Sequence, residues 1–123
     1  MSQKHLNVLG QELVECSCEP MTGFFRDGKC RTDANDYGSH TVCAVLDDAF
    51  LDYTVAQGND LKTPRPEFDF PGLKAGDHWC LCALRWLEAY EKGVAPRVCL
   101  ESTNLKATNV IPIDILKSHG TFH

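Results

Sequence analysis

Residues 41–58, TVCAVLDDAFLDYTVAQG, contain a strand pattern followed directly by a helix pattern. The apolar, partly β-branched run at 41–46 is typical of a buried strand. Asp47 or Asp48 can cap the helix that follows, over about 48–57, because an aspartate side chain accepts hydrogen bonds from the first helical amides. Gly58 is suited to the residue just past the helix end. This strand and helix set the fold class.

A second helix is predicted over about 78–92. Asp77 is its expected N-cap and Gly93 follows its last residue. One helical face would carry the residues at offsets of three, four, seven and eleven from Trp79, which are mostly aromatic or small. These residues are Trp79, Cys82, Ala83, Trp86 and Tyr90. We expect this face to pack in the core, with Trp79 partly exposed beside the preceding loop.

The rest of the chain alternates weakly between strand and helix patterns. Short strands are expected at 7–13, 97–102 and 110–113, with a helical turn after Asp114. Helices and strands occur without a regular βαβ order, which indicates an α+β fold. We therefore predict a single compact two-layer domain over 1–123, in which a small sheet packs against helices 48–57 and 78–92. The ends, about 1–6 and 118–123, are expected to be frayed.

Composition narrows the classes of partner. The 123 residues are 43% hydrophobic and 24% charged, with a formal net charge of −5, as in an ordinary globular protein. The basic residues are scattered, which argues against nucleic acid and anionic membranes as partners. The first residues lack the apolar stretch of a signal peptide, and no segment is long enough to span a bilayer. The sequence predicts a cytoplasmic protein whose partner is a small molecule; its oligomeric state is left open.

Residues 58–77, GNDLKTPRPEFDFPGLKAGD, form a long loop that is the best candidate for a ligand site. Loops of this length in compact domains are usually functional or disordered. Apolar anchors such as Phe70 and Leu73, together with three prolines, favour an ordered loop. The expected ligand is small and polar or anionic. The predicted ligand-binding residues are Asn59, Asp60, Thr63, Arg65, Trp79 and His40.

In this hypothesis, Arg65 binds the anion through its bidentate guanidinium and Trp79 forms an apolar wall. Asn59, Asp60 and Thr63 fix the ligand's orientation, and His40 contributes from the neighbouring strand. Each of the polar loop residues also has a structural explanation, because Asn, Asp and Thr side chains commonly bond the amides of their own loop.

The seven cysteines support a second hypothesis. In the cytoplasm they are expected to be reduced, and each is a core residue, a metal ligand or a reactive thiol. Cysteine and histidine within about thirty residues are the ligands of tetrahedral zinc sites, although this spacing is not that of a zinc finger. The alternative function is therefore a zinc-stabilised structural or protein-interaction domain. Its predicted ligands are Cys16, Cys30, His40 and Cys43.

A third hypothesis is a thiol-dependent enzyme that uses Cys80. If Asp77 caps the second helix, Cys80 is the third helical residue, where free amides and the helix dipole favour a thiolate. Cys80 and Cys82 would point about 200° apart on a helix and could not chelate one ion. In this reading Cys82 lies on the buried face and is structural.

Several long motifs resemble an uncharacterised bacterial family, a domain of unknown function. They are TGFFRDG, GSHTVCAVL, GNDLKTPRPEFDFPGL, GDHWCLCALRW and GVAPRVCLEST, and they span about residues 7–119. The resemblance implies one compact domain that contains helices and strands. It brings no reaction, ligand or cofactor.

Overall fold

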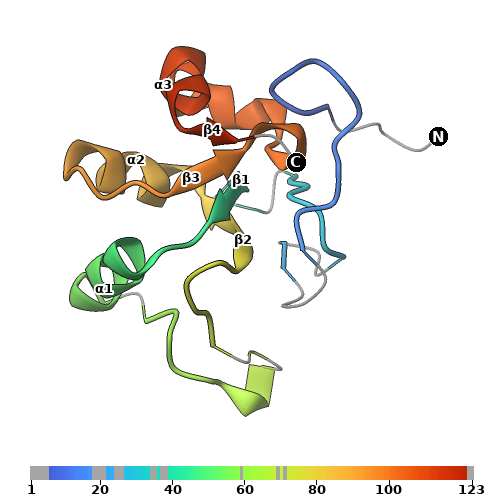
Figure 1. The fold of residues 1–123 in the computed structure, drawn as a ribbon. Helices are drawn as coiled ribbons and strands as arrows, with labels where there is room; N and C mark the ends of the chain where they lie inside the picture. The colour runs from blue at the N-terminus through green and yellow to red at the C-terminus, as the bar shows by residue number, and fades with distance from the viewer. Residues whose placement is uncertain are drawn as a thin grey trace.

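The computed structural model describes residues 6–17, 22–23, 27–33, 36, 39–58, 60–68, 70 and 72–121. Four strands form one sheet in the order β2–β1–β3–β4, with β1 antiparallel to β2 and β3, and β4 parallel to β3. The strands are β1 (His40–Val45), β2 (His78–Cys82), β3 (Arg97–Cys99) and β4 (Gly120–Thr121). The helices are α1 (Asp48–Ala56), α2 (Ala83–Glu91) and α3 (Ile113–Ser118). The prediction of an α+β fold with two main helices is confirmed (Figure 1).

The strand and helix predicted at 41–58 are confirmed as β1 and α1. The Asp47 carboxylate accepts a hydrogen bond from the Phe50 amide at 2.8 Å, as expected of an N-cap. Gly58 follows the helix with a φ of +87°, in the left-handed region that favours glycine. Phe50 and Leu51 are fully buried, so α1 is held against the sheet by its apolar face.

The predicted helix 78–92 is wrong over its first five residues. His78–Cys82 is β2, which pairs with β1, and α2 begins only at Ala83. In a strand, neighbouring side chains point to opposite faces, so Trp79 and Leu81 are buried on one side and Cys80 on the other. Periodicity cannot separate a helix from a strand over these five residues, because the apolar side chains would be buried in either structure. Asp77 consequently precedes a strand and does not cap a helix.

Two other strand predictions are also wrong. Residues 110–113 end in the first turn of α3, where Pro112 occupies the N-cap position with a φ of −54° that suits a helix start. Residues 7–13 form a turn in which the Asn7 amide bonds Gln11 O at 2.7 Å. The strand expected at 97–102 is shorter, since a 3-10 helix follows it at Leu100–Ser102. Part of the tail expected to be frayed forms β4 beside β3.

The two faces of the sheet are packed differently. One face belongs to the main hydrophobic core, together with Phe50 of α1 and Trp86 of α2. Its strand residues are Val42, Ala44, Trp79, Leu81 and Val98. The described residues that precede β1, called the N-terminal segment below, cross the other side of the sheet (Figure 1). There the Val8 amide donates to Thr103 O and the Val14 amide donates to Glu101 O, both at 3.0 Å. The opposite face of the sheet is therefore enclosed by the N-terminal segment and not by a helix.

Candidate metal centre

Five buried cysteines form a cluster separate from the main core. They are Cys16, Cys30, Cys43, Cys80 and Cys99, and the most exposed of them, Cys16, is only 8% accessible. Cys43 and Cys80 are cross-strand partners on β1 and β2. Cys99 follows Val98, the partner of Ala44, and so lies on the same face of the sheet as Cys43. The N-terminal segment supplies Cys16 and Cys30 from above this face.

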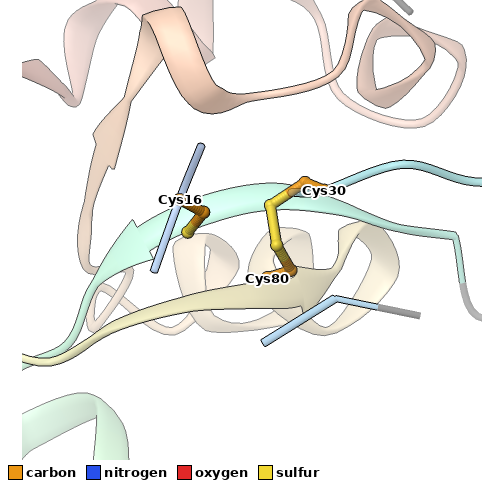
Figure 2. A group of neighbouring side chains, drawn as sticks. All are labelled: Cys16, Cys30 and Cys80. Atoms are coloured by element: carbon orange, nitrogen blue, oxygen red, sulfur yellow. A yellow bond between two sulfur atoms is a disulfide. The ribbon is translucent and has the colours of Figure 1, made fainter. Parts of the chain in front are cut away.

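Four of these cysteines form two disulfides in the structure. Cys16 bonds Cys43 and Cys30 bonds Cys80, with Cα–Cα distances of 5.7 and 5.3 Å. Figure 2 shows Cys16 close to the Cys30–Cys80 bond. The expectation of seven reduced thiols is therefore wrong for the state that the structure shows. Both bonds join the N-terminal segment to a strand of the sheet.

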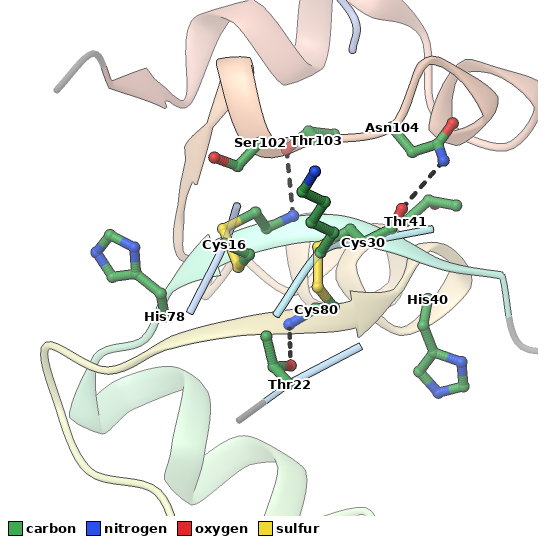
Figure 3. Close-up of a disulfide and its surroundings, with 12 residues drawn as sticks. Cys16, Thr22, Cys30, His40, Thr41, His78, Cys80, Ser102, Thr103 and Asn104 are labelled. Atoms are coloured by element: carbon green, nitrogen blue, oxygen red, sulfur yellow. Dashed lines mark hydrogen bonds between the residues drawn. A yellow bond between two sulfur atoms is a disulfide. The ribbon is translucent and has the colours of Figure 1, made fainter. Parts of the chain in front are cut away.

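Buried hydroxyl and amide groups fix the backbone around the cysteines (Figure 3). The amide of Cys80 donates to Thr22 Oγ1 at 2.8 Å, and the amide of Cys43 donates to Thr103 Oγ1 at 3.1 Å. Asn104 Nδ2 donates to Cys30 O at 3.0 Å. Three of the cysteines are thus also positioned by backbone hydrogen bonds that do not involve their sulfur atoms.

Gly23 explains part of the TGFFRDG motif. Its φ is +102°, and a Cβ at this position would collide with the carbonyl oxygen of Lys29. The turn closes through Gly28 N, which bonds Thr22 O at 3.0 Å. It brings the Thr22 hydroxyl to β2 and places Cys30 beside Cys80.

Two groups of three side chains have the spacing of metal ligands. The sulfur atoms of Cys16, Cys30 and Cys80 lie within 4.8 Å of one another, and so do the donor atoms of Cys43, His78 and Cys99. In a tetrahedral zinc site with Zn–S bonds of about 2.3 Å, neighbouring sulfurs lie about 3.8 Å apart. The Cys30 and Cys80 sulfurs, bonded at 2.03 Å, would have to move apart on reduction to reach this value, whereas Cys16 already lies within 4.8 Å of both. The cysteine and histidine side chains could therefore hold a metal ion once the disulfides are reduced.

Cys99, in the second group, holds its proton more strongly than an exposed cysteine would. Burial, with a further contribution from Glu101, raises the pKa of Cys99 to about 11. Its Sγ lies 3.7 Å from His78 Nδ1. Without a metal, Cys99 is thus a thiol at neutral pH, and only a bound cation would favour its thiolate.

The ligand set predicted for zinc is brought together in part. Cys16, Cys30 and Cys43 belong to the cluster, whereas His40 is in neither group of metal donors among the described residues. The sequence analysis missed Cys80, Cys99 and His78 as partners of these cysteines. The alternation of His78, Cys80 and Cys82 would have placed them on one face if the segment had been read as a strand.

Cys80 itself does not have the environment expected of a nucleophile at a helix start. It lies within β2, is 1% exposed and is bonded to Cys30. Helix-terminal amides therefore do not act on its sulfur. The residue at the start of α2 is Cys82.

The long loop is ordered around its predicted apolar anchors. Phe70 and Leu73 are 8% and 4% exposed, and Phe70 packs edge-to-face on Trp79 at 5.4 Å. Arg65 and Phe70 exchange two backbone hydrogen bonds, of 2.7 and 3.0 Å. The exposed Arg65 side chain is thus carried on a fixed backbone.

Two of the polar residues expected to bind a ligand, Asp60 and Thr63, form hydrogen bonds within the loop. The Asp60 carboxylate accepts hydrogen bonds from the amides of Lys62 and Thr63 and from the Thr63 hydroxyl. These bonds lower its pKa below the usual value of 3.8, and they give both residues a structural role in the loop. Asn59 lies outside the described residues.

Trp79 and His40 lie toward opposite ends of the paired strands β1 and β2. Trp79 is buried in the main core and pairs with Ala44, whereas His40 pairs with Cys82 at the other end of β2. His40 Nδ1 bonds Asp36 Oδ1 at 2.6 Å. The structure therefore does not bring Trp79, His40 and the loop residues to one point.

Asp36 gives the protein a predicted acid dependence. Burial raises the pKa of Asp36, but hydrogen bonds from His40 and Thr32 and the charge of His40 outweigh it and hold this pKa below 3.8. The ionised carboxylate therefore stabilises the fold above pH 3.8, and this contribution is lost as the pH falls through the lowered native pKa. Asp36→Asn should reduce stability at pH 7 by about 1–3 kcal/mol and should flatten the decline in stability below pH 4.

Denaturant unfolding between pH 3 and pH 7 measures this difference. The exposed Asp114, replaced by Asn, is the matched control and should lose much less stability at pH 7 than Asp36→Asn does. An Asp36→Asn variant that loses stability on acidification as steeply as the wild type would show that Asp36 does not contribute to the acid limb.

Comparison with known protein families assigns the chain to a family. Residues 6–120 match the family described as "Uncharacterized protein conserved in bacteria" (DUF2237). The chain belongs to this family. The match confirms the predicted resemblance to an uncharacterised bacterial family. A search of the curated proteins found no match. In the described part of the chain, no helix is both long and apolar enough to cross a bilayer.

Proposed function

We propose that the reduced protein is a zinc-stabilised domain whose metal is held by Cys16, Cys30, Cys43 and Cys80. The observation that carries the proposal is a buried cysteine cluster from two distant parts of the chain. In it the sulfurs of Cys16, Cys30 and Cys80 lie within 4.8 Å of one another, and Cys43 is bonded to Cys16. Four cysteines are the ligand set of closed structural zinc sites. Such a site would join the N-terminal segment to the sheet, as the two disulfides do.

The same four cysteines account for both chemical states. In a reducing compartment, such as the cytoplasm expected from the sequence, they would be thiolates that bind zinc. On oxidation, they pair as Cys16–Cys43 and Cys30–Cys80. Cys99 and His78 lie beside Cys43 as further donors, and Cys99 would be the first replacement for a lost ligand.

Zinc titration of the reduced chain tests the proposal. Protein reduced without a chelator is titrated against a chromogenic zinc indicator, and its melting temperature is followed in parallel. We expect one zinc ion per chain, release of protons on binding, and a rise in melting temperature, because metal binding and folding are coupled. Cys82→Ser is the matched control, since Cys82 is in neither donor group, and should bind zinc as the wild type does.

A reduced, folded protein that competes with the indicator no better than a protein without cysteine clusters would overturn the proposal. Binding of zinc by Cys82 or by surface histidines would also do so. Either would appear as retention of binding in Cys80→Ser, and binding by Cys82 would also appear as a loss of binding in Cys82→Ser.

A further inference from the structure

A buried thiol lies against one of the two disulfides. Cys99, in β3, is 1% exposed and belongs to neither disulfide. Its sulfur lies within 4.8 Å of the Cys43 sulfur, which is bonded to Cys16. Thiol–disulfide exchange requires this arrangement, because the attacking sulfur must reach one of the two bonded sulfurs. The oxidised cluster therefore holds both reactants of an exchange.

Thr103 holds the backbones of Cys43 and Cys99 together. Its hydroxyl oxygen accepts a hydrogen bond from the Cys43 amide at 3.1 Å and donates to the Cys99 carbonyl oxygen at 2.8 Å (Figure 3). The register of β1 and β3 leads to the same placement, because Ala44 pairs with Val98 and the next residues along this antiparallel register are Cys43 and Cys99. Opposed residues of antiparallel strands have Cα atoms about 4.5 to 5.5 Å apart, a separation that a disulfide can span.

We propose that Cys99 exchanges with the Cys16–Cys43 disulfide in the oxidised, metal-free protein. The Cys99 thiol loses its proton to water, and the thiolate attacks Cys43 Sγ. The Cys43–Cys99 bond forms as the Cys16–Cys43 bond breaks. The electron pair of the broken bond leaves with Cys16, which takes up a proton from water. One disulfide and one thiol are present before and after this step, so it needs no oxidant or reductant.

The exchange moves the thiol from the interior of the cluster toward its edge. Cys16 is 8% exposed, against 1% for Cys99, and it belongs to the N-terminal segment. The new disulfide joins β1 to β3, so the Cys30–Cys80 bond alone still joins the N-terminal segment to the sheet among the cysteines of the cluster. Cys16 then becomes the residue of the cluster that reacts with thiol reagents from solution.

The exchange belongs to the oxidised protein and does not depend on zinc. In the reduced, zinc-loaded protein there is no disulfide for Cys99 to attack. Cys99 is mainly a thiol at neutral pH, because burial and Glu101 raise its pKa to about 11. Only the thiolate attacks, so we expect the exchange to take minutes to hours, on the order of other uncatalysed disulfide rearrangements.

Peptide mapping of the full-length oxidised protein tests the exchange. The protein is freed of metal with a chelator, incubated with iodoacetamide at pH 8 without reductant, quenched with acid and digested with pepsin. Mass spectrometry should find a Cys43 peptide linked to a Cys99 peptide, and the label on Cys16 instead of Cys99. Fragmentation distinguishes Cys16 from Cys18, which lies outside the described residues. The labelling rate should not depend on protein concentration, because the exchange is intramolecular, and the measurement needs no variant.

Two variants identify the attacking thiol. In Cys99→Ala the label on Cys16 should fall to background, although Cys16 and its disulfide are unchanged. Cys82→Ser is the matched control, since Cys82 is in neither disulfide and neither donor group, and should keep the wild-type label on Cys16. Absence of the linked Cys43 and Cys99 peptides, label on Cys99 with the Cys16–Cys43 bond intact, or a wild-type label on Cys16 in folded Cys99→Ala would each overturn the proposal. None of these results changes the zinc content expected of the reduced protein, so the two proposals can fail separately.

Discussion

The Cys80→Ser variant is expected to lose both the zinc site and one disulfide. Under non-reducing conditions the variant lacks the Cys30–Cys80 bond, and its free energy of unfolding should fall by about 2–5 kcal/mol. In the zinc-loaded, reduced state the loss should be larger, because the binding free energy of a structural zinc ion contributes to folding. Chemical unfolding with and without reductant and zinc gives both values.

Cys82→Ser is the matched control for this experiment, two residues along the same strand. It is in no disulfide and in neither group of donors, so its stability should change by less than about 0.5 kcal/mol. Equal losses for the two variants would show that the serine substitutions act through β2 in general and not through the cysteine cluster.

Trp86→Ala is expected to cause the largest loss among substitutions in the main core. Trp86, in α2, is fully buried. Its ring stacks on that of Tyr90, with the ring centroids 5.9 Å apart, and meets the His119 ring edge-on, with the centroids 5.2 Å apart. Its indole Nε1 also donates to Pro96 O at 3.1 Å. Removal of this side chain should cost about 3–5 kcal/mol, from the lost burial and the cavity that remains.

Leu84→Ala, in the same helix, is the matched control for Trp86→Ala. Leu84 is 56% exposed, so its loss should change stability by about 0.5 kcal/mol or less. Thermal unfolding of both variants in the zinc-loaded state tests the prediction. A Trp86→Ala protein as stable as Leu84→Ala would mean that the helix-covered side of the sheet contributes little to stability.

The sequence predicted the elements whose signals are local. Residues 41–58 combine a β-branched run, the Asp47 cap and Gly58, and all three act over a few residues. The second helix could be recognised from Trp86 onward, but its start could not. His78–Cys82 is apolar at every position that either a helix or a strand would bury, and only the pairing of Cys80 with Cys43 distinguishes the two.

The cysteine cluster depends on contacts between residues far apart in the chain. Cys30 and Cys80 are separated by 50 positions, and Cys16 and Cys43 by 27. Local spacing indicated that Cys16, Cys30 and Cys43 had a role, but Cys80 was predicted to lie on a helix and was therefore kept apart from them. In the loop, Asp60 and Thr63 were predicted to bind a ligand because they are polar. In the structure their polar groups form hydrogen bonds with each other.

Metal analysis of freshly purified protein tests the zinc centre most directly. The chain is purified with a reductant and without a chelator, and its metal content and zinc X-ray absorption spectrum are measured together. The zinc proposal predicts about one zinc per chain with a coordination shell of sulfur at about 2.3 Å. A folded, metal-free protein that retains its structure in reductant would contradict it, and so would zinc bound mainly to oxygen or nitrogen.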